Sequence, residues 1–243
     1  MNEHPSIDKW LSDMKLSWIK DNYQSLLEEA VRKKTPHLEY LNELIRGEYE
    51  AKQSRGLIRR IKAAKFPVQK TLDNFNWQWP QKIDRALIEH LAQLHFVKTH
   101  NNVVFIGSVG VGKSHWATAL GMQACKKGLK VLFCNTIEAV NDLIAAQKNG
   151  NLKEELKKYI TPSLLILDEL GYLPIDKMGA NLLFQIISQR YERGSIIITT
   201  NKAFKDWTDI FNNDAATTSA VLDRIIHHCD SVPIESSSYR MKK

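Results

Sequence analysis

The sequence predicts an α/β fold in which a parallel sheet is sandwiched by helices and carries a phosphate-binding loop. From residue 103 onward, short continuous apolar runs alternate with helical stretches, as in parallel sheets that helices cover on both faces. A glycine-rich segment lies between the first of these runs and a helix. The expected strands are Val103–Ile106, Val131–Cys134, Leu164–Leu167, Ile196–Thr200 and Val232–Ile234.

Two domains are expected, a small all-α domain over residues 1–70 and the α/β domain over residues 71–243. A chain of 243 residues suits one large domain with a smaller appendage. Apolar residues recur at steps of three and four between residues 7 and 34, which predicts helix. We interpret Trp10 and Trp18 as part of the core-facing stripe of this segment.

A second N-terminal helix is expected to begin at Thr35-Pro36, a helix cap followed by proline at the first helical position. Phe66-Pro67 should end it, because the residue before a proline disfavours the helical conformation. Residues 66 to about 82 are then expected to form a linker. The apolar stripe of the helix is Leu38, Leu41, Leu44 and Ile45, and the aromatic anchors of the linker are Phe75, Trp77 and Trp79.

The net charge of +7 is concentrated in one stretch of the chain. Residues 52–70 contain seven lysines and arginines and no acid, so the rest of the chain is balanced. Such a run is often a solvated helix face, but an excess this local favours contact with phosphate groups. A polyanionic partner is therefore expected. The candidate DNA-binding residues in this stretch are Arg55, Arg59, Arg60, Lys62 and Lys65.

The segment Gly-Ser-Val-Gly-Val-Gly-Lys-Ser matches the pattern G-x-x-x-x-G-K-[ST] between an expected strand and an expected helix. Glycines let such a loop bring backbone N–H groups to phosphate oxygens, and the helix N-terminus adds partial positive charge. Lys113 should reach the β- and γ-phosphates of ATP, and the Ser114 hydroxyl should coordinate Mg²⁺. The candidate nucleotide-binding residues are Gly107, Ser108, Val109, Gly110, Val111, Gly112, Lys113, Ser114 and His115.

Polar residues follow two of the later strands. Asp168 and Glu169 end the strand Leu164–Leu167, where Asp168 would complete the Mg²⁺ shell and Glu169 would polarise the water that attacks the γ-phosphate. Acids at such positions also cap helices, which is the alternative interpretation. Asn201 follows the strand Ile196–Thr200 and could orient the attacking water, although an isolated asparagine there is more often a turn residue.

Arginines near the C-terminus are candidates for stabilising charge in the transition state, because a guanidinium matches phosphate geometry. Arg224 and Arg240 form one pair of candidates, and Arg190 and Arg193 form a rival pair. Surface ion pairs are an equally good explanation of these arginines. The run His227-His228-Cys229 suggests a metal site, but adjacent residues in a helix point apart and no matching ligands stand out. We interpret that run as structural.

Several features bear on the setting of the protein. No apolar run approaches the length needed to span a bilayer, and the polar N-terminus lacks a signal-peptide core. Three widely spaced cysteines, Cys125, Cys134 and Cys229, indicate a reducing compartment rather than a disulfide framework. A cytoplasmic protein without a membrane partner is therefore expected.

The chain resembles IstB, the transposition helper ATPase that some bacterial insertion sequences encode, within the DnaC-like group of AAA+ proteins. The resemblance covers nearly the whole chain. It rests on Ala63-Ala64-Lys65-Phe66-Pro67, Thr71-Leu72-Asp73-Asn74-Phe75, Gly110-Val111-Gly112-Lys113-Ser114-His115, Asp168-Glu169-Leu170-Gly171-Tyr172-Leu173-Pro174, Arg190-Tyr191-Glu192-Arg193-Gly194-Ser195, Thr200-Asn201, Trp207, Leu222-Asp223-Arg224-Ile225-Ile226-His227-His228 and Ser238-Tyr239-Arg240.

This resemblance implies an ATP-driven homo-oligomer, a ring or a helical filament, that wraps or bends double-stranded DNA and hands it to a transposase. It implies that Arg224 is an arginine finger acting across a subunit interface and that Arg240 is a sensor arginine. Two departures stand out. Ser108-Val109 replaces the two prolines usual in the family, and the chain stops three residues after Arg240, which implies a truncated C-terminal lid.

The resemblance also implies a second DNA-contacting surface, because the segment from residue 136 to residue 158 lines the DNA path in related initiator-like proteins. Lys148 and Lys153 are its candidate contacts, with Lys157 and Lys158 beside them. Neither surface shows a base-reading motif, so phosphate contact with little sequence preference is expected. A DnaC-like loader of a replicative helicase is the alternative function.

Overall fold

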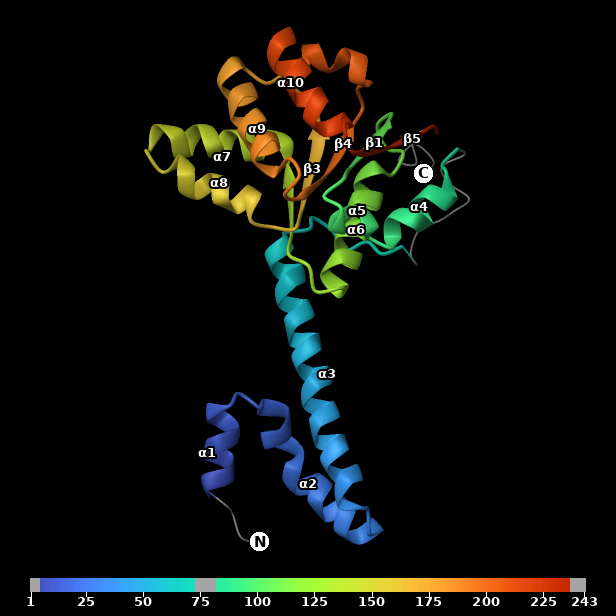
Figure 1. The fold of residues 1–243 in the computed structure, drawn as a ribbon, viewed down its shortest axis with the longest axis vertical. Coiled ribbons are helices and arrows are strands. Elements are labelled where there is room, and N and C mark those ends of the chain that lie inside the picture. The colour runs from blue at the N-terminus through green and yellow to red at the C-terminus, as the bar shows by residue number, and fades with distance from the viewer. Residues whose placement is uncertain (1–4, 73–81, 237–243) are drawn as a thin grey trace. The chain divides into compact units, whose positions relative to one another are not determined.

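The computed structural model describes residues 5–72 and 82–236, which form two compact units. The first unit extends to Arg59 and the second begins at Arg60, and each is described by itself (Figure 1). None of the helices in these two ranges is long and apolar enough to cross a membrane.

The first unit is entirely helical. It contains α1 (Pro5–Asp13), α2 (Ser17–Lys33) and most of α3 (His37–Ala64). The helical stretch expected between residues 7 and 34 is therefore interrupted, because Lys15 adopts a left-handed conformation (φ 56°) and ends the first helix. A second left-handed residue, Lys34, ends α2 and donates its backbone N–H to the carbonyls of Ala30 and Val31.

The contact between α2 and α3 is specific. The Trp18 ring lies so close to Gly47 that a Cβ there would fall 2.1 Å from it, so any larger residue at this position would displace the ring. The carboxylate of Glu48 accepts hydrogen bonds from the Ile19 N–H (3.0 Å) and from Arg55 (2.8 Å). Burial raises the pKa of Glu48, but these hydrogen bonds outweigh that effect and leave the pKa below its ordinary value.

Much of the apolar face expected in the core of this unit is exposed. Leu44 is buried as predicted, but the prediction for Trp10 is wrong because its side chain is 57% exposed. Leu38, Leu41 and Ile45 are likewise exposed. Helical periodicity therefore identified a real apolar stripe, but most of it is exposed in the described part of the first unit.

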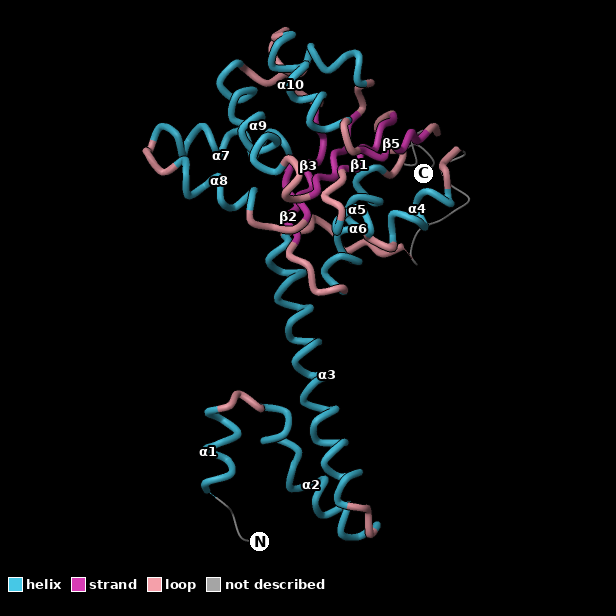
Figure 2. The backbone as a smooth tube through the Cα atoms, viewed as in Figure 1, coloured by secondary structure: helices cyan, strands magenta, loops and turns pink. Residues whose placement is uncertain are grey.

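The second unit is built on a parallel sheet with the strand order β2-β3-β4-β1-β5, and its parallel pairing is as the sequence predicted. Each strand differs from its expected range by at most a few residues, and helices flank the sheet (Figure 2). The strands are β1 (Asn102–Gly107), β2 (Val131–Asn135), β3 (Leu164–Leu170), β4 (Ser195–Thr200) and β5 (Cys229–Ile234).

Helices cover the two faces of the sheet differently. α6 (Lys113–Lys126) packs on one face, where a Cβ at Gly121 would collide with Ile166 and the ring of Phe66. The other face forms the main core with α7, α9 and α10, and alternate strand residues such as Val104 and Leu165 point into it. The remaining helical elements are α4 (Arg85–Ala92), α5 (His95–Lys98), α7 (Thr136–Lys148), α8 (Leu152–Ile160), α9 (Lys177–Arg190), η1 (Phe204–Asp209) and α10 (Ala215–Ile226).

Side-chain caps set where the helices of the main core begin. Asn135, Asp176 and Asp214 each accept a hydrogen bond from a backbone N–H in the first turn of α7, α9 and α10, respectively. α3 ends at Ala64, just before Phe66-Pro67 as predicted, and the Phe66 ring packs against the Phe133 ring with 6.2 Å between centroids. The predicted linker anchors Phe75, Trp77 and Trp79 lie outside the described residues.

Candidate nucleotide-binding site

The glycine-rich loop connects the end of β1 to the start of α6, as its sequence predicted. Gly110 (φ 81°) and Gly112 (φ 97°) adopt left-handed conformations, which glycine reaches without strain. Gly107 is required for a different reason, because a Cβ there would lie 2.4 Å from the carbonyl oxygen of Ile234 in β5. The loop therefore sits at the carboxyl end of β1, an inner strand of the sheet, against the first turn of α6.

Two side chains at the start of α6, Lys113 and His115, each lie within hydrogen-bonding distance of backbone carbonyl groups. Lys113 Nζ donates to the carbonyl oxygens of Gly107 (2.8 Å) and Ser108 (2.7 Å), so the ammonium group lies over the loop. His115 is half-buried, with Nε2 3.4 Å from the Thr71 carbonyl, and burial lowers its pKa. The ammonium of Lys113 is therefore placed where phosphate oxygens would approach the loop.

Ser114 and Asp168, the predicted Mg²⁺ ligands, are in direct contact. The Ser114 hydroxyl donates to Asp168 Oδ1 at 2.8 Å, and the Thr199 hydroxyl donates to the same oxygen at 2.5 Å. Thr199 is available because β4 lies between β1 and β3 in the sheet. Asp168 is 8% exposed, so its carboxylate is held by two hydroxyl groups in a nearly closed setting.

Glu169 lies beside Asp168 in a strained backbone conformation, with φ 60°. The regular pairing of β3 with β4 is interrupted between Leu167 and Leu170, and the Glu169 N–H bonds instead to the Thr199 hydroxyl at 2.9 Å. Its carboxylate accepts a hydrogen bond from Asn135 Nδ2 at 2.9 Å. The two adjacent acids therefore point to different partners, and neither caps the next helix, which Asp176 caps.

Thr199 and Asn135 are residues of this site that the motif analysis missed. Both are polar side chains at or near the carboxyl end of a predicted strand, the position that also identified Asp168 and Asn201. Because parallel strands end at one edge of the sheet, that rule applied to every strand would have placed them at this edge, but only the strand order brings Thr199 beside Asp168. Asn201 itself follows β4 at this edge and is exposed.

Arg190 and Arg224, which the sequence left as rivals, occupy different environments. Arg190 is 1% exposed and donates hydrogen bonds to five backbone carbonyls, and burial lowers its pKa to about 10. Arg190 is therefore a structural residue that cannot reach a nucleotide on another subunit. Arg193 is exposed in the following turn. Arg240 lies outside the described residues.

Arg224 is half-buried on α10, with its guanidinium 4.9 Å from the centre of the Phe184 ring. Asn102 Nδ2 donates to the carbonyl of Ile225, next to Arg224, so this part of α10 lies at the amino end of β1. The phosphate loop begins at the opposite end of the same strand, about 17 Å away for five residues at the usual rise. Arg224 is thus separated from the nucleotide site of its own chain.

The predicted DNA-contacting residues are spread over two helical regions. Arg59, Lys62 and Lys65 are exposed in or just after α3, whereas Arg55 pairs with Glu48 and Arg60 Nε donates to the Cys125 carbonyl at 2.9 Å. Arg55 therefore has an acidic partner from outside the basic stretch. Lys148 and Lys153 are exposed on either side of the turn between α7 and α8, while Lys158 pairs with Asp142 and Glu155.

The chain is similar in sequence to proteins encoded by bacterial insertion sequences. Two relatives, from Pseudomonas aeruginosa and Geobacillus stearothermophilus, are named for ATP binding and for insertion sequences IS21 and IS5376. The first is 38% identical over 96% of this chain and 88% of its own length, and the second is 34% identical over 98% and 94%.

Solved structures of similar fold include two AAA+ proteins. The DnaC helicase loader has a TM-score of 0.56 and 25% identity over 68% of this chain and 96% of its own. The DnaA initiator bound to AMPPCP and single-stranded DNA has a TM-score of 0.59 and 22% identity over 71% of this chain and 52% of its own. The sequence profile of the IstB-like ATP binding protein family matches residues 10–243, and the chain belongs to that family.

Proposed function

We propose that this protein is an ATPase that uses ATP hydrolysis to deliver or activate a transposase on double-stranded DNA. The observation that carries the ATPase part is the contact of Ser114 and Thr199 with Asp168, immediately beside Glu169 and the phosphate loop. Names of the insertion-sequence relatives support the link to transposition.

The residues at the loop fit ATP and Mg²⁺. Backbone N–H groups of the loop bind the phosphates, and the Lys113 ammonium offsets their negative charge. Ser114 and Asp168 would hold the Mg²⁺ ion, since a hydroxyl and a carboxylate oxygen 2.8 Å apart are the oxygen donors that this ion prefers. Mg²⁺ held there would neutralise negative charge on the phosphates.

Hydrolysis requires a base and a way to orient water. Glu169 accepts a proton from the attacking water, and Asn201 at the same edge of the sheet orients that water. Asn135 binds the Glu169 carboxylate in the structure, so the carboxylate must share or exchange this partner when it takes the water. The site thus holds Asp168 firmly while leaving its neighbour Glu169 a single side-chain partner among the described residues.

Arg224 acts on a nucleotide bound to a neighbouring copy of the chain. It is too far from the loop of its own subunit to reach a γ-phosphate there, and its face of α10 is partly exposed. A ring or helical filament of identical subunits would bring Arg224 of one copy to the site of the next. Arg240 is proposed as a further sensor of the bound nucleotide.

DNA binding is proposed to use phosphate contacts with little sequence preference, because the candidate residues are exposed lysines and arginines. The first candidate surface is formed by Arg59 and Lys62 on α3 and Lys65 just after it, and the second by Lys148 at the end of α7 and Lys153 at the start of α8. Arg55 and Arg60 have partners within the chain, and their contribution to DNA contact is expected to be smaller.

A helicase-loading function is the second candidate, favoured by the structural likeness to the DnaC helicase loader. The two functions use the same ATP site and differ in the partner. Strand transfer by the transposase of the same insertion sequence should depend on this protein and ATP under the first proposal. Loading of a replicative helicase onto DNA without any effect on strand transfer would favour the second.

Lys113→Ala tests ATP binding, the first requirement of the ATPase proposal. This variant should lose measurable binding of a fluorescent ATP analogue, because the ammonium group offsets charge on two phosphates. Lys126→Ala is the matched control, since it removes an exposed lysine from the other end of the same helix. Equal affinity in both variants would contradict the assignment of the nucleotide site.

A further inference from the structure

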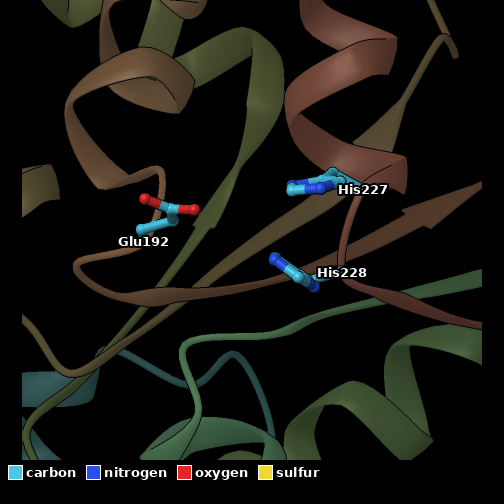
Figure 3. A group of neighbouring side chains, drawn as sticks. All are labelled: Glu192, His227 and His228. Carbon is cyan, nitrogen blue, oxygen red and sulfur yellow. The ribbon is translucent and has the colours of Figure 1, made fainter.

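A cluster of one carboxylate and two imidazoles lies outside the nucleotide site. Glu192, His227 and His228 each present a ligand atom, and these atoms all lie within 4.8 Å of one another (Figure 3). All three side chains are exposed. We propose that Glu192, His227 and His228 bind a divalent transition-metal ion of the zinc class.

The donor set fits this class of ion. Imidazole nitrogen and carboxylate oxygen are both common ligands of Zn²⁺, and two nitrogens with one oxygen leave a fourth position for water. Ligand atoms around tetrahedral Zn²⁺ lie about 3.3 Å apart for bonds of about 2.0 Å. Side-chain rotations at the surface can close the difference from 4.8 Å, since none of the three side chains is packed in the core.

The histidine pair does not follow the helix geometry that argued against a metal site in the sequence. α10 ends at Ile226, so His227 and His228 lie in the turn that leads into β5. Their rings are 4.0 Å apart between centroids rather than on opposite sides of a helix. Cys229, the next residue, packs against the core instead of joining the cluster.

The backbones that carry the three ligands are fixed on both sides. Glu192 occupies a left-handed turn (φ 57°) just after Arg190, whose guanidinium binds five carbonyls and holds this region. The His228 carbonyl accepts a hydrogen bond of 2.7 Å from the Asn102 N–H at the start of β1. Backbone hydrogen bonds therefore hold both turns from which the ligands project.

A neighbouring tyrosine orients one of the ligands. The Tyr191 hydroxyl lies 2.7 Å from His227 Nδ1, and the two rings are stacked with 6.0 Å between their centroids. When His227 carries a proton on Nδ1, this nitrogen donates to the hydroxyl oxygen and Nε2 is left as the metal-binding atom. Tyr191 would therefore act as a positioning residue for the site.

Metal binding would join the turn after α9 to the end of α10, the helix that carries Arg224. Glu192, His228 and Arg224 line one small surface cavity. Of the three ligands, only Glu192 carries a negative charge. That charge would offset the positive charge of the ion next to Arg224, so the carboxylate should contribute most to binding.

The proposal is tested by isothermal titration of the full chain with Zn²⁺, without nucleotide and with excess Mg²⁺ to occupy the oxygen site at Ser114 and Asp168. One ion should bind per chain. Glu192→Gln and the double variant His227→Ala/His228→Ala should each weaken binding by more than about tenfold, and Tyr191→Phe should weaken it about tenfold. Co²⁺ should give the intense visible absorption of a four-coordinate site in the wild type and lose it in these variants.

Two matched controls separate this site from other metal binding. His90→Ala/His95→Ala removes another pair of neighbouring exposed histidines, and His100→Ala removes a histidine from the same cavity. Both should keep the wild-type affinity. Absence of binding to the wild type up to about millimolar Zn²⁺, or wild-type affinity in Glu192→Gln, would overturn the proposal. If the double histidine variant fails to fold, the result for Glu192→Gln decides between these outcomes.

Discussion

The two ends of the parallel strands in the second unit differ sharply in what they hold. At the carboxyl ends, Lys113, Ser114, Asp168 and Thr199 are linked to the loop or to one another by hydrogen bonds of 2.5–2.8 Å. At the amino ends, Arg190 is buried in a network of carbonyls and Arg224 is partly exposed. Within one subunit, the candidate phosphate-binding groups therefore lie at one edge of the sheet, whereas Arg224 lies at the other.

This division suggests that the complete catalytic site needs two copies of the chain. Under the proposed function, the preassembled edge would let a single subunit bind ATP, and Arg224 at the other edge would make hydrolysis depend on a second subunit. Substitutions at each edge in turn should therefore have separable effects on binding and on turnover.

Arg224→Ala should have the largest effect on turnover, a fall of about 10³–10⁵-fold, because an arginine finger contributes that much to phosphoryl transfer. ATP binding by the isolated subunit should stay nearly unchanged, as should the thermal unfolding temperature. Arg190→Ala is the contrasting variant, since it removes the donor to five buried carbonyls and should lower the unfolding temperature markedly. An Arg224→Ala protein with normal turnover would exclude the finger.

Glu169→Gln should lower turnover by about 10²–10⁴-fold while ATP binding persists, because the amide keeps the shape of the side chain but cannot accept a proton from water. Steady-state phosphate release and a fluorescent-ATP titration on the same preparation measure the two properties. Normal phosphate release from this variant would mean that Glu169 is not the base.

Thr199→Val should lower turnover by about 10–100-fold, the range expected when a group that holds a metal ligand is removed. Its hydroxyl is the only described side-chain group that bonds both Asp168 and the Glu169 N–H. Thr200→Val is the matched control, because the Thr200 hydroxyl bonds backbone groups of Leu170 and Lys202. Equal losses in both variants would point to a general weakening of β4.

Arg59→Ala and Lys148→Ala should have the smallest effects, a weaker affinity for DNA and a salt dependence flatter by about one unit for each phosphate that is no longer neutralised. Titrations at several salt concentrations with the ATP-bound protein measure both quantities. Arg55→Ala should change the slope less than Arg59→Ala, since Arg55 already pairs with Glu48. Unchanged slopes for both Arg59→Ala and Lys148→Ala would place the DNA elsewhere.

The sequence was most informative where a residue pattern has one structural meaning. Buried parallel strands produce continuous apolar runs, so all five strands were found, and the phosphate loop followed from its glycines and Lys113. Thr199 was missed because a threonine in a strand is ordinary until the strand order puts it beside Asp168, opposite Ser114. Strand order is a property of the whole fold, and local patterns do not encode it.

In the first unit, the sequence was less informative about the structure. Periodicity predicted apolar faces correctly, but it cannot tell a face that packs inside the chain from one that is left exposed, as with Leu38 and Leu41. The break at Lys15 was missed because lysine rarely adopts a left-handed conformation and gives no signal of it. The cluster around Glu192 was missed because its members come from two turns about 35 residues apart, a separation that no short motif spans.

The most direct test of the division between the two edges is a mixture of Arg224→Ala and Lys113→Ala subunits. Each variant alone should lack turnover, since the first lacks the Arg224 guanidinium and the second should bind no ATP. In mixed oligomers some interfaces join the intact loop of an Arg224→Ala subunit to the intact arginine of a Lys113→Ala subunit, so ATP hydrolysis should reappear. If differently tagged subunits are shown to co-assemble and hydrolysis stays absent, Arg224 does not act between subunits.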